Sequence, residues 1–239
     1  MSVCRLLLVF LTCASLASAG GNAPPSRMLW VWANDADLRF LRPNQAGVAW
    51  LGMTIDLDGR RPPVSEPRAS SFLVSPGVYQ MVVVRLQQNP ASEPHPVWSP
   101  EQRKATVAMI LDLVRITRSR ALQIDFDAPR SARPFYRELL ADLRRDLKPG
   151  VFLSITALTS WCSAPRPWPD GLTVDEIVPM DFQTRSDSPY ADPSCRKSIG
   201  LQAAGTPRPT EVPGRRTYLF TYGAWSRAAV DEAFRVARQ

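Results

Sequence analysis

The chain alternates between helix-like and strand-like segments from residue 99 to residue 158, and this alternation limits its fold more than any other feature. Residues 99–120 carry apolar side chains at helical spacing, with Ser99 suited to the N-cap position. Residues 121–127 (ALQIDFD) are strand-like, a second helical stripe follows them, and residues 150–158 (GVFLSITAL) are strand-like again. This order is typical of a parallel sheet that is covered by helices.

Six further segments have the length and apolar content of strands: residues 27–33, 47–57, 77–86, 175–183, 197–202 and 217–223. With the two strands above they predict an α/β fold of the (β/α)8 TIM-barrel type. The Pro-rich stretches 59–76 and 203–216 show no helical stripe, so we expect loops in place of some outer helices. An open doubly wound sheet is the alternative. Because no Gly-rich phosphate loop follows a strand, its nucleotide-binding form has no support, and no cofactor is expected.

The first 19 residues have the features of a signal peptide. Arg5 is followed by an apolar run from Leu6 to Leu16, and the small residues Ala17 and Ala19 predict cleavage after Ala19. We therefore expect a signal peptide (1–19), a flexible linker (20–26) and a single barrel domain (27–239), in a periplasmic or secreted protein. No transmembrane segment is expected after cleavage, because no later apolar run approaches membrane-spanning length.

Export affects how the cysteines are interpreted. Cys162 and Cys195 remain in the exported chain, and a pair in an oxidising compartment favours a disulfide over two separate thiols. A metal site is not expected, because these cysteines and His95 do not have zinc-ligand spacing. His95 also lies in a Pro-rich segment without a nucleophile motif, so a Ser-His-Asp triad is not supported.

The formal charge is +7, which falls to +6 when Arg5 leaves with the signal peptide. The basic residues form no cluster interleaved with aromatic residues, so nucleic acid is not expected as a partner. The charge indicates either a solvated basic surface or mild attraction to an anionic polymer or envelope surface. The oligomeric state stays open.

Carboxylates at the ends of two predicted strands are the best candidates for chemistry. In such barrels the active site lies at the carboxyl ends of the strands. Asp127 and Asp181 each come at such an end, and glycoside hydrolysis needs two carboxylates. Asp125 shares a strand face with Asp127 but lies deeper, so it is either structural or part of the substrate-binding surface. If it is structural, Arg85, at the end of its own strand, or nearby hydroxyl groups would hold it.

Aromatic residues follow several of these strands. Sugar-binding sites use flat aromatic surfaces, and Trp161, Tyr222 and Trp225 are candidates for such a platform, with Trp168 nearby. The alternative is that the tryptophans anchor loops to the core.

An ordered set of motifs resembles an uncharacterised bacterial family, the domain of unknown function family 3142. The motifs are QIDFDA, a following helix rich in Leu and Arg, LSITAL-x-SWC, WPDGL and VDEIVPMDFQ, and they span about residues 120–183. The resemblance implies a secreted or envelope-anchored protein with a sugar-hydrolase-like barrel.

A more distant likeness is to the chitinase-like barrels of glycoside hydrolase family 18, whose fourth strand reads D-x-x-D-x-D-x-E. Asp125 and Asp127 match its D-x-D, but Pro129 stands where the catalytic glutamate would be. Met180 and Asp181 loosely match Met-x-Tyr-Asp of the sixth strand, without the tyrosine. The substrate-assisted mechanism of that family therefore does not carry over.

The sequence leads to two main hypotheses. The first is an exported carbohydrate-active protein, glycoside-hydrolase-like, that acts on a polysaccharide with Asp127 and Asp181. The second is a non-catalytic glycan-binding or envelope-assembly protein on a degenerate hydrolase barrel. A purely structural interaction protein becomes the better interpretation if the strand ends form no cleft.

Overall fold

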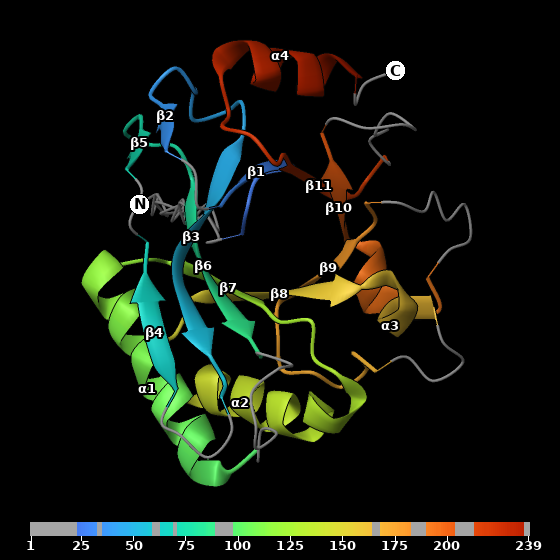
Figure 1. Ribbon diagram of the computed structural model, residues 1–239. Helices are drawn as coiled ribbons and strands as arrows, with labels where there is room; N and C mark the ends of the chain where they lie inside the picture. Colours follow the sequence, from blue (N-terminus) through green and yellow to red (C-terminus); the bar gives the residue numbers. More distant parts are fainter. Residues whose placement is uncertain are drawn as a thin grey trace, which may run out of the picture.

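The computed structural model describes residues 23–32, 35–58, 63–68, 71–88, 98–163, 168–182, 190–203 and 213–236. The predicted signal peptide and His95 lie outside these residues, as do residues 20–22 of the predicted linker. Within them, eight parallel strands close into a barrel, because β1 pairs with both β11 and β3 (Figure 1). The strands are β1 (Arg27–Val31), β3 (Gly47–Asp56), β6 (Gln80–Gln87), β7 (Ala121–Asp125), β8 (Phe152–Leu158), β9 (Glu176–Met180), β10 (Ser198–Gln202) and β11 (Arg216–Phe220). The predicted (β/α)8 fold is confirmed, and the open sheet is excluded.

The helices cover the barrel unevenly. α1 (Pro100–Thr117) and α2 (Arg133–Asp146) pack side by side against the barrel, and α4 (Arg227–Val236) follows β11 (Figure 1). Only the five-residue α3 (Thr159–Ser163) and a 3-10 turn (Pro193–Arg196) were found in the connections from β8 to β10 within the described residues. The barrel therefore lacks some outer helices, as the sequence predicts.

The connections around β3 hold short strands where loops are expected. β4 (Val64–Pro67) and β5 (Phe72–Val74) lie within the Pro-rich stretch 59–76, and β5 pairs with β2 (Ala36–Leu38). β1 pairs with β3 only as far as Trp50, and β4 pairs with the rest of the same edge, from Met53 onward. β4 thus satisfies backbone groups of β3 that β1 leaves exposed. The expectation of loops was wrong here, because pairing of this kind leaves little trace in a Pro-rich sequence.

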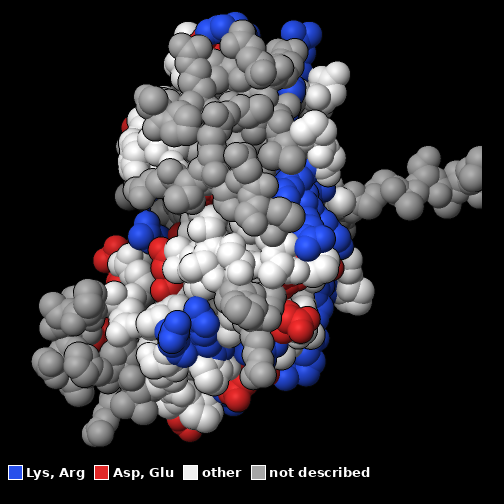
Figure 2. Space-filling view, turned by 90° about the vertical axis from the view of Figure 1, so that its right-hand side faces the viewer, with Lys and Arg blue, Asp and Glu red and all other residues white. Residues whose placement is uncertain are grey.

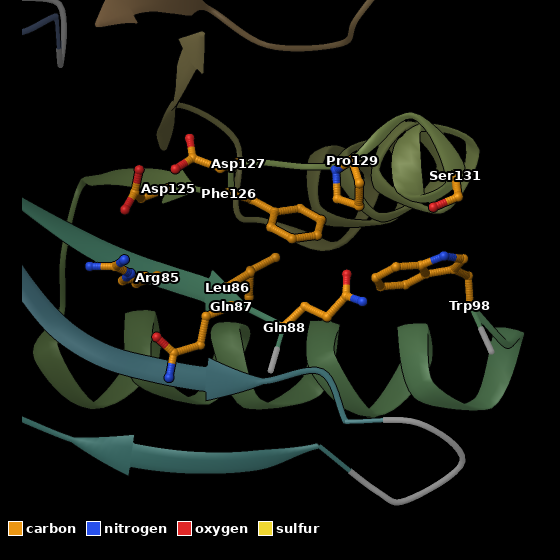
Figure 3. A pocket seen from close by; sticks show the side chains of 10 residues that line it. All are labelled: Arg85, Leu86, Gln87, Gln88, Trp98, Asp125, Phe126, Asp127, Pro129 and Ser131. Carbon is orange, nitrogen blue, oxygen red and sulfur yellow. The ribbon is translucent and has the colours of Figure 1, made fainter. Parts of the chain in front are cut away.

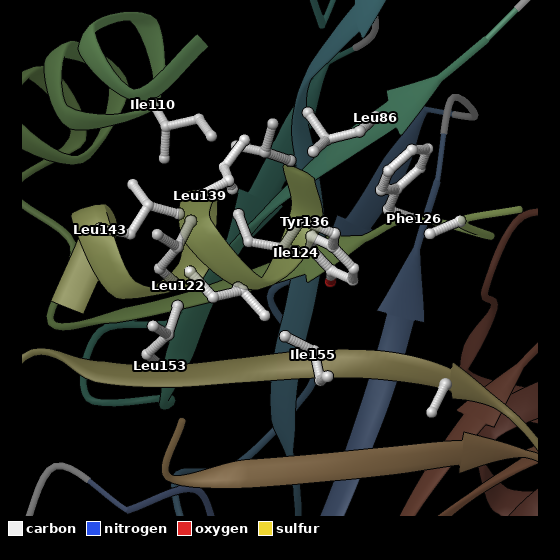
Figure 4. Close-up of a cluster of buried hydrophobic side chains, with 14 of the residues drawn as sticks. Leu86, Ile110, Leu122, Ile124, Phe126, Tyr136, Leu139, Leu143, Leu153 and Ile155 are labelled. Carbon is white, nitrogen blue, oxygen red and sulfur yellow. The ribbon is translucent and has the colours of Figure 1, made fainter. Parts of the chain in front are cut away.

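The main hydrophobic core lies between the barrel and the helices. Leu122 and Ile124 point outward from β7 and pack against α2, whose buried stripe includes Leu139 and Leu143 (Figure 4). α1 begins as predicted, because the Ser99 hydroxyl accepts a hydrogen bond from the Gln102 backbone N–H at 3.1 Å. The apolar face of β7 meets the helices, so its polar residues face the barrel interior.

A disulfide joins Cys162 in α3 to Cys195 in the 3-10 turn that precedes β10, with the Cα atoms 6.0 Å apart. The predicted pairing is therefore confirmed. Closing a loop of this length adds roughly 3–4 kcal/mol to the free energy of unfolding by restricting the unfolded chain.

Among the described residues no helix is both long and apolar enough to cross a membrane.

Candidate functional site

The candidate site lies at the carboxyl ends of β6 and β7. Arg85 of β6 is in register with Asp125, the last residue of β7, and Asp127 follows two residues later. The side chains of Arg85, Asp125 and Asp127 lie close together at one end of a pocket (Figure 3). The parallel strands bring these three charged groups to one mouth, which is where barrel enzymes carry their sites.

Two cavities share these three residues. One, of about 800 Å³, we call the polar cavity; its other lining residues are Leu86, Gln87, Gln88, Trp98, Phe126, Pro129 and Ser131 (Figure 3). The other, of about 480 Å³, we call the aromatic cavity; its other lining residues are Trp32, Leu158, Thr159, Met180, Phe182, Phe220 and Tyr222. The polar cavity lies over β6 and β7, and the aromatic cavity over β8, β9, β11 and β1. The carboxylates therefore lie where two open spaces meet.

Asp125 is almost fully buried, with 8% of its surface exposed. The pKa of its carboxyl is raised to about 6, mainly by burial and in smaller part by the charge of Asp127. The Thr156 hydroxyl, which donates to Asp125 Oδ1 at 2.7 Å, opposes this rise, as does the charge of Arg85. Of the two structural partners considered from sequence, a hydroxyl is therefore the one that bonds to Asp125.

Asp127 lies at the rim and is open to solvent on one side. Protein atoms packed around its other side raise the pKa of its carboxyl, and the positive charge of Arg85 lowers it. Arg85 acts on both carboxyls electrostatically, and within the described residues it forms no ion pair with either. A carboxyl at the rim with a raised pKa suits a group that gains and loses a proton.

The aromatic cavity has one continuous wall of rings. Phe220 stacks against Phe182 with ring centroids 5.4 Å apart, and its ring edges meet Trp32 and Tyr222. Tyr222 is 76% exposed, which is unusual for a large apolar ring and leaves its face available to a ligand. The predicted position of Tyr222 at the mouth is therefore correct.

Asp181 does not line either cavity, although the residues on both sides of it do. Met180 and Phe182 face the mouth, and strand alternation turns Asp181 the opposite way. Burial raises the pKa of Tyr190, on the outer side of β9, to about 12, and the charge of Asp181 adds to that rise. Asp181 therefore lines neither of the two cavities that Asp127 lines, and its pairing with Asp127 stays a prediction.

Two of the expected platform tryptophans are core residues. Trp161 is 2% exposed and packs against Trp168 behind the disulfide. Trp225 is 5% exposed, and its indole N–H donates to the Trp30 carbonyl at 2.7 Å. Neither ring is accessible to a sugar, because each covers apolar surface between the barrel and a helix.

Sequence reasoning missed several residues that line the two cavities. Trp32 and Phe182 each come directly after or near the end of a strand, the same signal that identified Tyr222. Gln88 follows β6 in the same way.

Tyr136 lines neither cavity and gave no such signal in the sequence, since it belongs to the buried stripe of α2. Its hydroxyl is buried without a hydrogen-bond partner among the described residues, and burial raises its pKa, with the charges of the two aspartates adding to the rise.

A second acid, Glu176, lies inside the barrel at the opposite end. Its carboxylate accepts hydrogen bonds from Ser154, Ser198, Tyr218 and Arg216. Its side chain is 2% exposed. A fully bonded carboxylate at the amino ends of the strands indicates a role in stability.

No cluster of three or more potential metal ligands occurs among the described residues.

No family model and no curated protein matches the chain. The expected membership of the domain of unknown function family 3142 is therefore not supported. Solved structures do resemble it. A candidate chitinase A from Streptomyces coelicolor is 10% identical, with a TM-score of 0.54 over 89% of this chain and 97% of that one. The chain has the fold of that barrel, so the expected likeness to chitinase-like barrels is confirmed for the fold.

The Bacillus cereus spore cortex-lytic enzyme SleL is 14% identical, with a TM-score of 0.49 over 75% of this chain and 51% of that one. A likeness at this level carries no weight here.

Proposed function

We propose that the protein is an exported glycoside hydrolase that cleaves a polysaccharide at the Asp125–Asp127 pair. The observation that supports this most is that Asp125 and Asp127 lie where an open polar cavity meets a wall of aromatic rings. Carbohydrates bind to such combinations of flat rings and polar groups. The described fold and the name of the Streptomyces coelicolor protein support the same class of substrate.

In this proposal Asp127 is the proton donor. Burial raises its pKa, which favours the protonated form of the carboxyl, and its rim position lets it reach a glycosidic oxygen. Asp125, held by Thr156, would place negative charge beneath the sugar ring, where positive charge develops as the bond breaks. Water would then add to the sugar carbon and return a proton to Asp127. Arg85 would keep part of the Asp125 population ionised by lowering its pKa.

The two cavities suggest that an internal bond is cleaved. Because they extend over different strands on either side of the carboxyl pair, a polymer can lie across the pair with sugars in both. Rings would contact sugars in the aromatic cavity, and amides such as Gln88 would contact them in the polar cavity. Tyr222→Ala and Gln88→Ala should shift the cleavage position of an end-labelled oligosaccharide in opposite directions. A shift in the same direction for both variants would contradict the two-cavity assignment.

The decisive test is turnover by Asp127→Asn against a panel of bacterial polysaccharides that includes chitin and peptidoglycan strands. Loss of a general acid should lower turnover by about 10²–10⁴-fold while the unfolding curve stays unchanged. Asp181→Asn is the matched control, since its carboxylate lies outside both cavities. Equal turnover by wild type and Asp127→Asn would exclude the proposal, and loss of turnover in both variants would restore the pairing expected from sequence.

Export is the second part of the proposal. The Cys162–Cys195 disulfide supports an oxidising compartment. Determining the N-terminal residue of the protein recovered from periplasm or medium tests it, and cleavage after Ala19 is the expected result.

Binding without hydrolysis is the second candidate, and Pro129 is the observation that favours it. This residue lines the polar cavity at the position where the chitinase-like motif has its acid. A binding protein would retain its affinity for the glycan in Asp127→Asn and release no product from any substrate.

A further inference from the structure

The end of the barrel opposite the candidate site carries a ring of basic residues. Because the strands are parallel, the residues that begin or directly precede them share one end. Arg120, Lys197 and Arg215 directly precede β7, β10 and β11, Arg27 begins β1, and Lys148 lies in the turn between α2 and β8. We call these five residues the basic face. Figure 2 shows that Lys and Arg side chains gather along one side of the molecule instead of spreading evenly.

The acidic residues among these strand starts are neutralised. Asp175, which precedes β9, accepts hydrogen bonds from Arg144 at 2.5 Å and from the Leu153 backbone N–H at 2.7 Å. Glu176 lies inside the barrel and is paired with Arg216. The basic face therefore keeps a net positive charge at its surface.

Three cations of the basic face are available to a partner. Arg120, Lys148 and Lys197 are exposed, and none of them forms an ion pair with a carboxylate in the described ranges. Arg118, which ends α1 in the left-handed conformation, adds a fourth exposed charge beside Arg120. Because these cations form no ion pair within the protein, they can bind an external anion without breaking an interaction that stabilises the fold.

A cavity of about 560 Å³ also opens at this end. Arg27, Arg42 and Arg235 line it together with the amide side chains of Asn44 and Gln45. Asp231 and Phe234 complete the lining, and the Arg27 guanidinium lies over the Phe234 ring, 5.2 Å from its centroid. The Arg235 guanidinium is paired with the Glu232 carboxylate at 2.7 Å. The Arg27 and Arg42 guanidiniums and the two amides suit a phosphate group, since guanidinium and amide N–H groups donate hydrogen bonds to its oxygens.

We propose that the basic face docks on an anionic phospholipid surface, with a lipid phosphate in the Arg27–Arg42–Arg235 cavity. A ring of charge around a barrel end suits a flat surface better than a single polymer strand. Docking would turn the Asp125–Asp127 mouth away from the membrane, and the proposal stands whether or not the mouth is catalytic.

The test is sedimentation with vesicles of phosphatidylcholine alone and of equal parts phosphatidylcholine and phosphatidylglycerol. The protein is produced from the full chain, so that its N-terminus is processed naturally. Binding to the anionic vesicles should be at least about tenfold tighter than to the neutral ones, and should weaken with salt. Lys148→Gln/Lys197→Gln should lower it by about tenfold or more, and Arg42→Gln by about threefold to fivefold.

The charge-matched control is Lys104→Gln/Arg130→Gln, which removes two exposed cations near the mouth end of the barrel. This variant should bind like the wild type. Equal binding to both kinds of vesicle, no binding, or equal losses in both double variants would overturn the proposal. Soluble polyphosphate is the competitor; if it binds as tightly per charge as the vesicles do, a polymer and not a membrane is the partner, and the proposal fails.

Discussion

Two acids inside the same barrel are held in opposite ways. Glu176, at the amino ends of the strands, accepts hydrogen bonds from two serines, a tyrosine and an arginine. Asp125, at the carboxyl ends, accepts a side-chain hydrogen bond from Thr156 alone within the described part of the chain, and burial raises its pKa to about 6. β8 provides a hydrogen-bond donor to each acid. Ser154 donates to Glu176, and Thr156, two residues later, donates to Asp125.

The difference shows what distinguishes a structural carboxylate from a candidate functional one. Glu176 has four hydrogen-bond donors around its buried carboxylate, so its burial stabilises one arrangement of the strands. Asp125 has too few donors to offset its burial, so its charge is costly and its proton is easily exchanged near neutral pH. Acids in the second condition are characteristic of active sites.

The largest expected effect on stability is at Glu176. Glu176→Gln leaves the Arg216 guanidinium without its anionic partner, so the free energy of unfolding should fall by about 3 kcal/mol. Urea denaturation measures this. A loss below about 1 kcal/mol would show that the network at the amino ends contributes little, and the contrast with Asp125 would fail.

Asp125→Asn should act in the opposite direction. The pKa of Asp125 is about 6 when folded and about 4 when unfolded, so the folded state binds more protons between these values. Stability of the wild type should therefore decrease as pH rises from about 4 to about 6. Asn removes this loss, so the variant should be more stable than the wild type above pH 6, by at most about 3 kcal/mol. Thermal unfolding across this pH range measures the slope, and an unchanged slope would contradict the assignment.

The two donors on β8 give the smallest and sharpest comparison. Ser154→Ala and Thr156→Val each remove one hydrogen bond to a buried carboxylate, which is worth about 1 kcal/mol. Only Thr156→Val should raise the pKa of Asp125, because the lost bond favours the ionised form. Carbon-detected NMR titration of the Asp125 carboxyl reports the pKa, with Ser154→Ala as its control. A pKa that rises equally in both variants would mean that the two clusters are coupled along β8.

Part of the candidate site could be predicted from sequence. The i, i+2 spacing of Asp125 and Asp127 on a strand fixes that they share a face, and the parallel order fixes that Arg85 lies at the same end. Asp181 lines neither cavity, because only packing decides which alternate residues of a strand face inward. The sequence suggested Trp161 and Trp225 for the sugar platform, but both are buried in the core. A tryptophan that follows a strand can turn either to the mouth or to the core, and the sequence does not show which.

The sequence by itself determined the barrel, the disulfide and the depth order of the two aspartates, because these follow from local periodicity, chain order and cysteine count. Only the tertiary structure decided which acid is fully hydrogen-bonded and which keeps a raised pKa. The reason is that hydrogen-bond partners and desolvation come from residues far apart in the chain. Thr156 reaches Asp125 across 31 positions, and Tyr218 reaches Glu176 across 42.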